Sequence, residues 1–361
     1  MNGISVIMLV FALLGARDRL FGSRFGLGKE FEKGFMIFGS LALSMIGMIV
    51  LAPVIADLLE PVFGFIYRVL HIDPSIIPAS LFACDMGGSS VAYEVARDTA
   101  VGKLNGMVVS SMMGCTVSFT IPVALTMVKK DLHRELFLGM ACGIAAIPAG
   151  CIVSGFMLGV KPLELLLDML PLLVFSAIIA CGLIFASELT VKIFKIFGIF
   201  IKTLITTGLM LGILEHFAGV RLLDNLGSMA EAGQICFGAV VVLAGAFPLM
   251  AVVSRLLSRP LRAVGKAAGI SESATMGFLA TLVTSITTYE SMNGMDKKGV
   301  VLNSAFAVSA AFVFGGQLAF TMAFDQTAVP AFMVGKLVSG IAGLVVACFF
   351  CRAKYKTEPQ Q

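Results

Sequence analysis

Two polar interruptions inside otherwise apolar segments carry residue types that suit binding of a small ligand. In the first, over 75–98, the string Asp85-Met86-Gly87-Gly88 places a carboxylate beside two glycines. Glycine adopts positive φ and lets a ligand approach the backbone, and a helix that ends there leaves unpaired carbonyls at its negative dipole end. A carboxylate with such carbonyls suits a small cation. The alternative is that Asp85 only caps the returning helix.

The second interruption, over 272–295, carries hydroxyl groups in place of an acid. A hydroxyl both donates and accepts hydrogen bonds, which suits a ligand hydroxyl or a partly dehydrated ion. The alternative for each hydroxyl is a bond back to a carbonyl of its own helix, which is common for such residues in membrane helices. The candidates are Thr284, Ser285, Thr287 and Thr288.

Each interrupted segment ends on a Tyr-Glu pair, Tyr93-Glu94 in the first and Tyr289-Glu290 in the second. A tyrosine ring can face an ammonium group, and the adjoining carboxylate can pair with it. Arg97 lies within one helical turn of Glu94 and is a ready structural partner for it. Because Glu290 has no basic residue within a turn, it ranks next after the aspartate of the first segment as a ligand-binding acid.

The remaining acids and the histidines do not form a catalytic or metal-binding pattern. Glu164 and Asp168 stand at the mouth of an apolar run, and we expect both to be solvated. The three histidines do not cluster, and no nucleophile has a base at motif spacing. A zinc site needs three or four ligands held together. The sequence therefore predicts a protein that is not an enzyme and holds no metal or cofactor.

Composition sets the class of protein that must position these residues. The chain has 361 residues, of which 58% are hydrophobic and 13% charged, and its mean hydropathy is +0.98. A soluble globular domain is about half apolar and about a quarter charged. The net charge of +4 is too mild for a polyanionic partner, so nucleic acid is excluded. The composition predicts an all-α polytopic protein whose partner is the lipid bilayer.

The apolar runs predict about nine transmembrane helices, because about twenty residues cross a bilayer. The two interrupted segments are either full crossings or re-entrant hairpins that return to the face they left. At about 1.5 Å per residue, each arm of such a hairpin reaches roughly the midplane of the hydrocarbon core. The predicted spans cover residues 4–20, 35–57, 104–127, 134–159, 165–187, 196–216, 233–254, 299–323 and 330–351.

The distribution of basic residues favours the hairpins. Lysine and arginine collect on the cytoplasmic side of a membrane protein. With two re-entrant hairpins and an outside N-terminus, roughly nineteen basic residues fall inside and five outside, whereas two full crossings give roughly fourteen and ten. The sequence therefore predicts two hairpins, near 75–98 and 272–295.

The two halves of the chain share short motifs in the same order, at an offset of roughly 200 residues, and the predicted topology inverts one half against the other. The predicted units are a first repeat over 1–160, a connecting helix over 161–195, an inverted repeat over 196–351 and a cytoplasmic tail over 352–361. Interrupted segments at matching places in inverted repeats are typical of the substrate site of secondary transporters. The matched motifs are Glu60-Pro61 with Arg259-Pro260, the two Tyr-Glu pairs, Leu104-Asn105 with Leu302-Asn303, and Phe119-Thr120 with Phe320-Thr321.

The string Ala83-Cys84-Asp85-Met86-Gly87-Gly88 resembles the ethanolamine permeases of the EutH family, which serve bacterial ethanolamine utilisation. Ser111-Met-Met-Gly114 and Ile121-Pro-Val-Ala-Leu125 fit the same family, and the resemblance covers nearly the whole chain. It implies a multi-pass permease of the bacterial inner membrane that imports ethanolamine for catabolism.

A protonated ethanolamine has an ammonium and a hydroxyl, and the two interruptions offer an acid and a set of hydroxyls. We therefore expect Asp85 to pair with the ammonium while the Thr/Ser group or Glu290 receives the hydroxyl end. The alternative is a carrier for another small polar solute, such as an amino alcohol, an amino acid or a nucleoside. The sequence leaves open whether the chain works as a monomer or a homo-oligomer.

Overall fold

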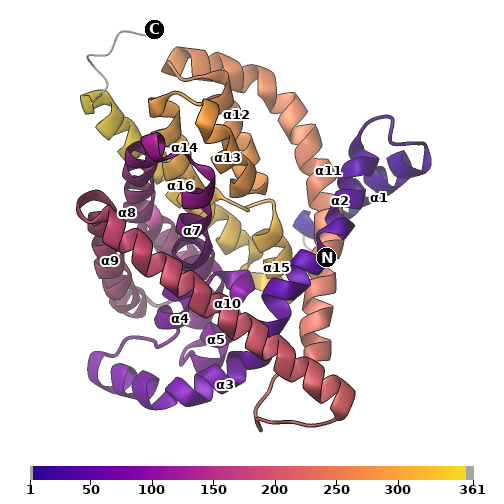
Figure 1. Ribbon diagram of the computed structural model, residues 1–361, viewed down its shortest axis with the longest axis vertical. Helices are drawn as coiled ribbons and strands as arrows, with labels where there is room; N and C mark the ends of the chain where they lie inside the picture. The colour runs from indigo at the N-terminus through magenta and orange to yellow at the C-terminus, as the bar shows by residue number, and fades with distance from the viewer. Residues whose placement is uncertain (1–2, 355–361) are drawn as a thin grey trace.

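The computed structural model describes residues 3–354, and within that range all regular structure is helical (Figure 1). The predicted all-α class is confirmed for these residues. Most of the predicted tail, from residue 355 onward, lies outside them. The α-helices are α1 (Gly3–Leu20), α2 (Leu27–Met36), α3 (Phe38–Leu70), α4 (Ile76–Leu81), α5 (Gly88–Val95), α6 (Thr99–Lys103), α7 (Ile121–Met127), α8 (His133–Met157), α9 (Pro162–Phe185), α10 (Ser187–Ala218), α11 (Met229–Ala268), α12 (Glu272–Val283), α13 (Ser285–Ser291), α14 (Lys297–Ala310), α15 (Gly316–Phe324) and α16 (Val329–Lys354).

Seven helical stretches in the described part of the chain are long and apolar enough to cross a membrane, and each overlaps a predicted span. The two remaining predicted spans are not among them. Helix α1, over predicted span 4–20, carries Arg17, Asp18 and Arg19 in its last turn, and these charges shorten its apolar stretch. The predicted span 299–323 is divided into α14 and α15 by residues 311–315, where Phe312 has a positive φ of 63°. The count of nine stays a prediction.

The first interrupted segment folds into two short helices, α4 and α5, which pack against each other. Between them lies a single 3₁₀ turn, Cys84–Met86. Gly87 has a φ of +96°, a conformation that side chains disfavour, so the predicted need for glycine there is confirmed. Gly88 is required for a different reason, because a Cβ on it would lie 2.2 Å from the carbonyl oxygen of Phe82.

The second interrupted segment has the same plan, with α12 and α13 packed against each other across a break at Thr284. The end of α12 is tied to the break between α14 and α15. The amide of Phe312 donates to Thr281 O at 3.1 Å, and the amide of Phe314 donates to Leu282 O at 2.8 Å. The carbonyls left free where α12 ends are thus partly satisfied by an unwound neighbour.

The long segment after each helix pair passes through the centre of the molecule. The first, Thr99–Met127, is one continuous helical stretch whose middle, Leu104–Gly114 and Thr116–Thr120, is π-helical. The second is the broken helix formed by α14 and α15. Such π-helical and broken stretches in membrane helices are tolerated where protein surrounds them, and both segments are buried here.

These two segments run in opposite directions. The end of the first is held at the start of the second, because Asn293, just ahead of α14, accepts from Lys129 N and donates to Met127 O. The start of the first is held at the end of the second by a contact of Lys103 with Asp325. In Figure 1, α12 and α13 lie near the top of the molecule and α4 and α5 in its lower half.

Candidate functional site

The carboxylate of Asp85 lies in the turn between α4 and α5, inside the protein but partly accessible. The turn is fixed from several sides: Ala83 N donates to Ser118 Oγ at 3.1 Å, and Gly87 packs on Met48 of α3. Among the described residues, Asp85 has no hydrogen bond or ion pair to another residue. An interior carboxylate without such partners is costly and is available to a cation.

A buried lysine, Lys336 in the last long helix α16, interacts electrostatically with Asp85. Its side chain is fully buried, and Nζ donates to Ser111 O and to Gln317 Oε1, each at 2.8 Å. The ammonium also lies 5.3 Å from the centre of the Phe332 ring. It is an electrostatic neighbour of Asp85, but no contact within 4.0 Å joins the two among the residues that the structure describes. Through its hydrogen bonds to Ser111 and Gln317, Lys336 connects α16 to the π-helical segment and to α15.

Our sequence reasoning did not single out Lys336. A signal was present, because Lys336 is the sole charged residue of the predicted span 330–351 and lies about a third of the way along it. A charged residue at that depth is a functional candidate by default.

Cys115 connects the neighbourhood of Asp85 to the second interrupted segment. It is an electrostatic neighbour of Asp85, of Lys336 and of the Tyr289 hydroxyl. Ser285 and Tyr289 lie one turn apart on α13, and both are completely buried. Neither Ser285 Oγ nor Tyr289 Oη has a hydrogen-bond partner in the described structure. A buried hydroxyl without a partner calls for a ligand or a water molecule. Ser90, Ser176 and Ser309 also have unpaired buried hydroxyls, and what distinguishes Tyr289 is its electrostatic interaction with Cys115.

The other predicted hydroxyls follow the local alternative or face outward. Thr284 Oγ1 accepts from Ile286 N at 3.3 Å and caps α13. Thr288 Oγ1 donates to Gly277 O at 3.2 Å and lies 2.8 Å from Thr281 Oγ1. The side chain of Thr287 is exposed. Of the four predicted hydroxyls, Ser285 is the one that the described structure leaves both buried and without a hydrogen-bond partner.

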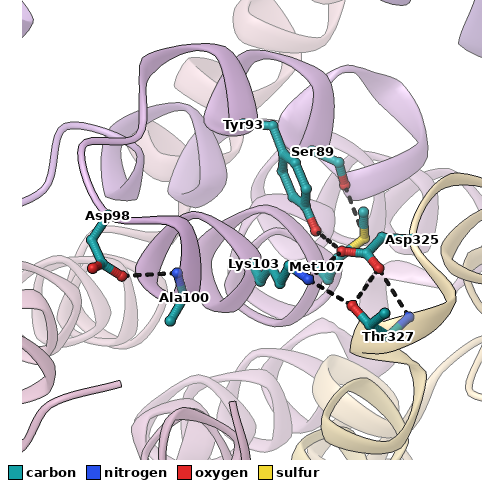
Figure 2. A network of polar contacts seen from close by, with 8 residues as sticks. All are labelled: Ser89, Tyr93, Asp98, Ala100, Lys103, Met107, Asp325 and Thr327. Atoms are coloured by element: carbon teal, nitrogen blue, oxygen red, sulfur yellow. Dashed lines mark hydrogen bonds and ion pairs between the residues drawn. The ribbon is translucent and has the colours of Figure 1, made fainter. Parts of the chain in front are cut away.

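Figure 2 shows that Tyr93 is part of a contact between the two halves of the chain. Its hydroxyl donates to Asp325 Oδ2 at 2.9 Å, and Lys103 Nζ lies 3.3 Å from the same oxygen. Thr327 donates to Asp325 Oδ1 through its amide and its hydroxyl. Burial raises the pKa of Asp325. The hydrogen bonds from Thr327 and Tyr93 and the charge of Lys103 together lower that pKa by more than burial raises it, so the pKa lies below its ordinary value.

The two predicted glutamates lie away from the buried centre. Both Glu94 and Glu290 are exposed. The expected pairing of Arg97 with Glu94 is wrong, because Arg97 instead forms an ion pair with Glu60 at the end of α3. The expectation of a solvated Asp168 is also wrong, since its side chain is 1% exposed. The position of Asp168 in the chain did not reveal that α9 packs against α8.

A surface recess of about 610 Å³ lies apart from this chemistry, between α11 and α15. Its lining holds only apolar residues and amides, among them Gln234, Phe237 and Gln326. In residues 3–354 no three His, Cys, Asp or Glu side chains gather as a metal site.

Long apolar helices around an interior carboxylate, a buried lysine and unpaired hydroxyls define a multi-pass membrane protein with a polar centre suited to a small solute. The family described as "Ethanolamine utilisation protein, EutH" matches residues 2–350. The chain belongs to this family.

Relatives cover nearly all of the chain. It is 39% identical to the "Probable ethanolamine permease EutH" of Listeria monocytogenes, over 98% of this chain and 95% of that protein. It is 36% identical to the protein of the same name from Salmonella typhimurium, over 99% and 98%. It is also 34% identical to the Bacillus subtilis protein "Uncharacterized protein YxeR", over 98% and 95%. No solved structure matches the chain. Membership of this family places the chain in the bacterial inner membrane.

Proposed function

We propose that this protein is a secondary transporter that imports ethanolamine, as the protonated amine, across the bacterial inner membrane. The observation that carries the proposal is the interior carboxylate of Asp85, which lacks a partner in the described structure. A primary amine is protonated at neutral pH, as the lysine side chain is, and an ammonium is the counter-charge such a carboxylate needs. Two relatives that cover nearly the whole chain carry the name ethanolamine permease.

In this proposal α4–α5 and α12–α13 are re-entrant hairpins that enter the membrane from opposite faces, within nine spans. The support is the opposite direction of the two long segments, each held at its start against the other's end. The connections at the hairpin bases are also alike. Asp73 accepts from Arg97 N and Asp98 N across the base of the first hairpin, and Asp296 accepts from Ser271 N across the base of the second. Inverted repeats of this kind place the substrate at their interface.

The bound ethanolamine extends between the two hairpin tips. Its ammonium pairs with Asp85, next to the backbone of Gly87 and Gly88, and its hydroxyl reaches Ser285 and Tyr289. Support comes from the two unpaired buried hydroxyls on α13 and from Cys115, which neighbours both ends. In this proposal Lys336 is the cation near Asp85 when no substrate is bound. The positive charge of Lys336 repels the substrate ammonium and weakens its binding.

A carrier for another amino alcohol is the second candidate. The proposed site offers one acid and hydroxyl groups, and these would bind amino alcohols of different lengths. Competition separates the two. Counterflow of labelled ethanolamine in proteoliposomes is expected for the full-length protein, with unlabelled ethanolamine as the strongest competitor among amino alcohols, amino acids and nucleosides. Absence of counterflow, or stronger competition by another solute class, would contradict ethanolamine as the substrate.

The role of Asp85 is tested by Asp85→Asn, which keeps the shape of the side chain and removes its charge. Loss of a buried counter-charge costs about 3–5 kcal/mol. We therefore expect the Kd for ethanolamine to rise by at least about a hundredfold. Glu188→Gln, the same chemical change on an exposed acid of α10, is the matched control and should leave binding unchanged. Wild-type binding by a folded Asp85→Asn protein removes Asp85 from the site.

A further inference from the structure

A second interior carboxylate lies outside the proposed substrate site, on the connecting helix α9. Asp168 stands in the second turn of α9 and is 1% exposed. Its Oδ1 accepts one hydrogen bond, from Asn105 Nδ2 at 3.1 Å. Its Oδ2 is buried and has no hydrogen-bond partner in the part of the chain that the structure describes. One neutral donor is too little to hold a buried carboxylate charged, so this group needs a proton or a cation.

The partner of Asp168 is incomplete in the complementary way. Asn105 is completely buried, at the start of the π-helical segment, and its Oδ1 also lacks a hydrogen bond. An amide and a carboxylic acid satisfy each other through two bonds, amide N–H to carboxyl oxygen and carboxyl O–H to amide oxygen. The first of these bonds is present. One proton on Asp168 Oδ2 supplies the donor that the second bond requires.

A chain of hydrogen bonds leads from this pair toward the edge of the protein. Asn105 Nδ2 also donates to Ser75 Oγ at 3.0 Å, and Ser75 Oγ donates to Asp73 Oδ1 at 2.6 Å. Asp73 is 8% exposed, and three backbone amides donate to it, from Ser75, Arg97 and Asp98. This chain of hydrogen bonds connects Asp73, which accepts from several donors, to Asp168, which accepts from one.

We propose that Asp168 is a proton-carrying carboxyl whose protonation, paired with Asn105, is coupled to substrate movement. One proton from water binds Asp168 Oδ2 and neutralises the carboxylate in one state of the transporter, and the same proton returns to water in the other state. Asn105 belongs to the segment that also supplies Ser111 O to Lys336, so the proton site and the proposed substrate site share one helix. This proposal rests on the proposed transport of ethanolamine.

A proton fits better than a metal cation. Hard cations such as Ca²⁺ take about six or more oxygen ligands, and even smaller sets need several. Between these two hydrogen-bonded residues, the described structure leaves two oxygens unpaired, Asp168 Oδ2 and Asn105 Oδ1. Within residues 3–354, the titratable groups that interact electrostatically with Asp168 are Cys151 of α8 and Asp73 ahead of α4, and neither brings a positive charge.

Asp168→Asn imitates the protonated acid, because its NH₂ can donate to Asn105 Oδ1, and it cannot release a proton. Glu164→Gln is the matched control, an acid-to-amide change one turn earlier, where the acid pairs with Lys161 at the helix start. Both are made in the full-length protein and reconstituted. Infrared difference spectra after a pH step report protonation of a buried carboxylic acid, and flux assays report ethanolamine movement, after subtraction of leak in protein-free liposomes.

We expect the carboxylic acid band to be present in the wild type and Glu164→Gln and lost in Asp168→Asn. We also expect Asp168→Asn to keep counterflow exchange and to lose uptake driven by a pH gradient. An unchanged infrared band in Asp168→Asn, or pH-driven uptake equal to the wild type, overturns the proposal. Uptake driven by a sodium gradient that Asp168→Asn abolishes overturns it in favour of a metal cation. If the wild type moves no ethanolamine, the proposed function fails, whereas the infrared result still decides the proton site.

Discussion

Replacement of Gly114 by alanine would displace the turn that carries Asp85. Gly114 is the last residue of the first π-helical stretch, Leu104–Gly114, and packs directly on the last turn of α4. A Cβ at this position would lie 2.0 Å from Phe82 O and 2.5 Å from Ala79 O. Both are backbone atoms, so no side-chain rotation relieves the contact. Because real Cβ contacts stay beyond 3.0 Å, the two backbones must separate by at least 1.0 Å.

Such a separation has an expected cost in stability and in function. Overpacking of a well-packed interior costs about 1–3 kcal/mol. A shift of about 1 Å in a positioned group costs on the order of a hundredfold in enzymes, and we expect the ethanolamine Kd of Gly114→Ala to rise by about tenfold or more. Thermal unfolding of the detergent-solubilised protein and binding of labelled ethanolamine measure the two effects.

The control is Gly39→Ala, in α3, where the added Cβ has no atom within 4 Å. Gly39 lies in the first turn of α3, where an added methyl group contacts nothing, so this variant should unfold at the same temperature as the wild type. If Gly114→Ala matches the wild type in both unfolding and binding, the close approach of the two backbones does not position Asp85, and the reasoning fails.

Two further predictions concern charged contacts. Lys336→Met removes the positive charge near Asp85, so we expect ethanolamine to bind more tightly, by about 1 kcal/mol or about fivefold in Kd. Calorimetric titration measures this change. Weaker binding by the variant would contradict the prediction and would mean that Lys336 stabilises the bound ligand. Asp325 has a lowered pKa in the folded protein, so it stabilises above its unfolded value of about 4, and that contribution disappears as the pH falls through the folded pKa. Asp325→Asn should therefore lower the unfolding temperature at pH 7 and flatten its decline in acid, and an identical acid profile of variant and wild type would contradict this role.

Residue types and their spacing along the chain were enough to predict the features that depend on local chemistry. The apolar composition predicted a multi-helical membrane protein, and seven long apolar helices overlap the predicted spans. The need for glycine at Gly87 follows from the local turn, and its positive φ is observed. Asp85 was singled out because a carboxylate in an apolar segment is expensive wherever the chain places it.

Features that depend on contacts between distant segments were not predictable in this way. The burial of Asp168 comes from α8, from α4 and from Asn105, which lies 63 residues away in the chain. The partner of Tyr93 is Asp325, 232 residues away. The break at 311–315 contains no proline, and it persists because its amides bond to the end of α12.

The sequence by itself determined which segments prefer lipid and which residues are costly inside it, because transfer free energies depend on residue type and on the nearest neighbours. Only the tertiary structure decided which of those costly residues receive partners. Packing pairs Lys336 with Ser111 and Gln317, while Asp85, Ser285 and Tyr289 stay unpaired among the described residues. Hydrogen bonds and ion pairs act over a few ångströms of space, and distance along the chain does not fix that space.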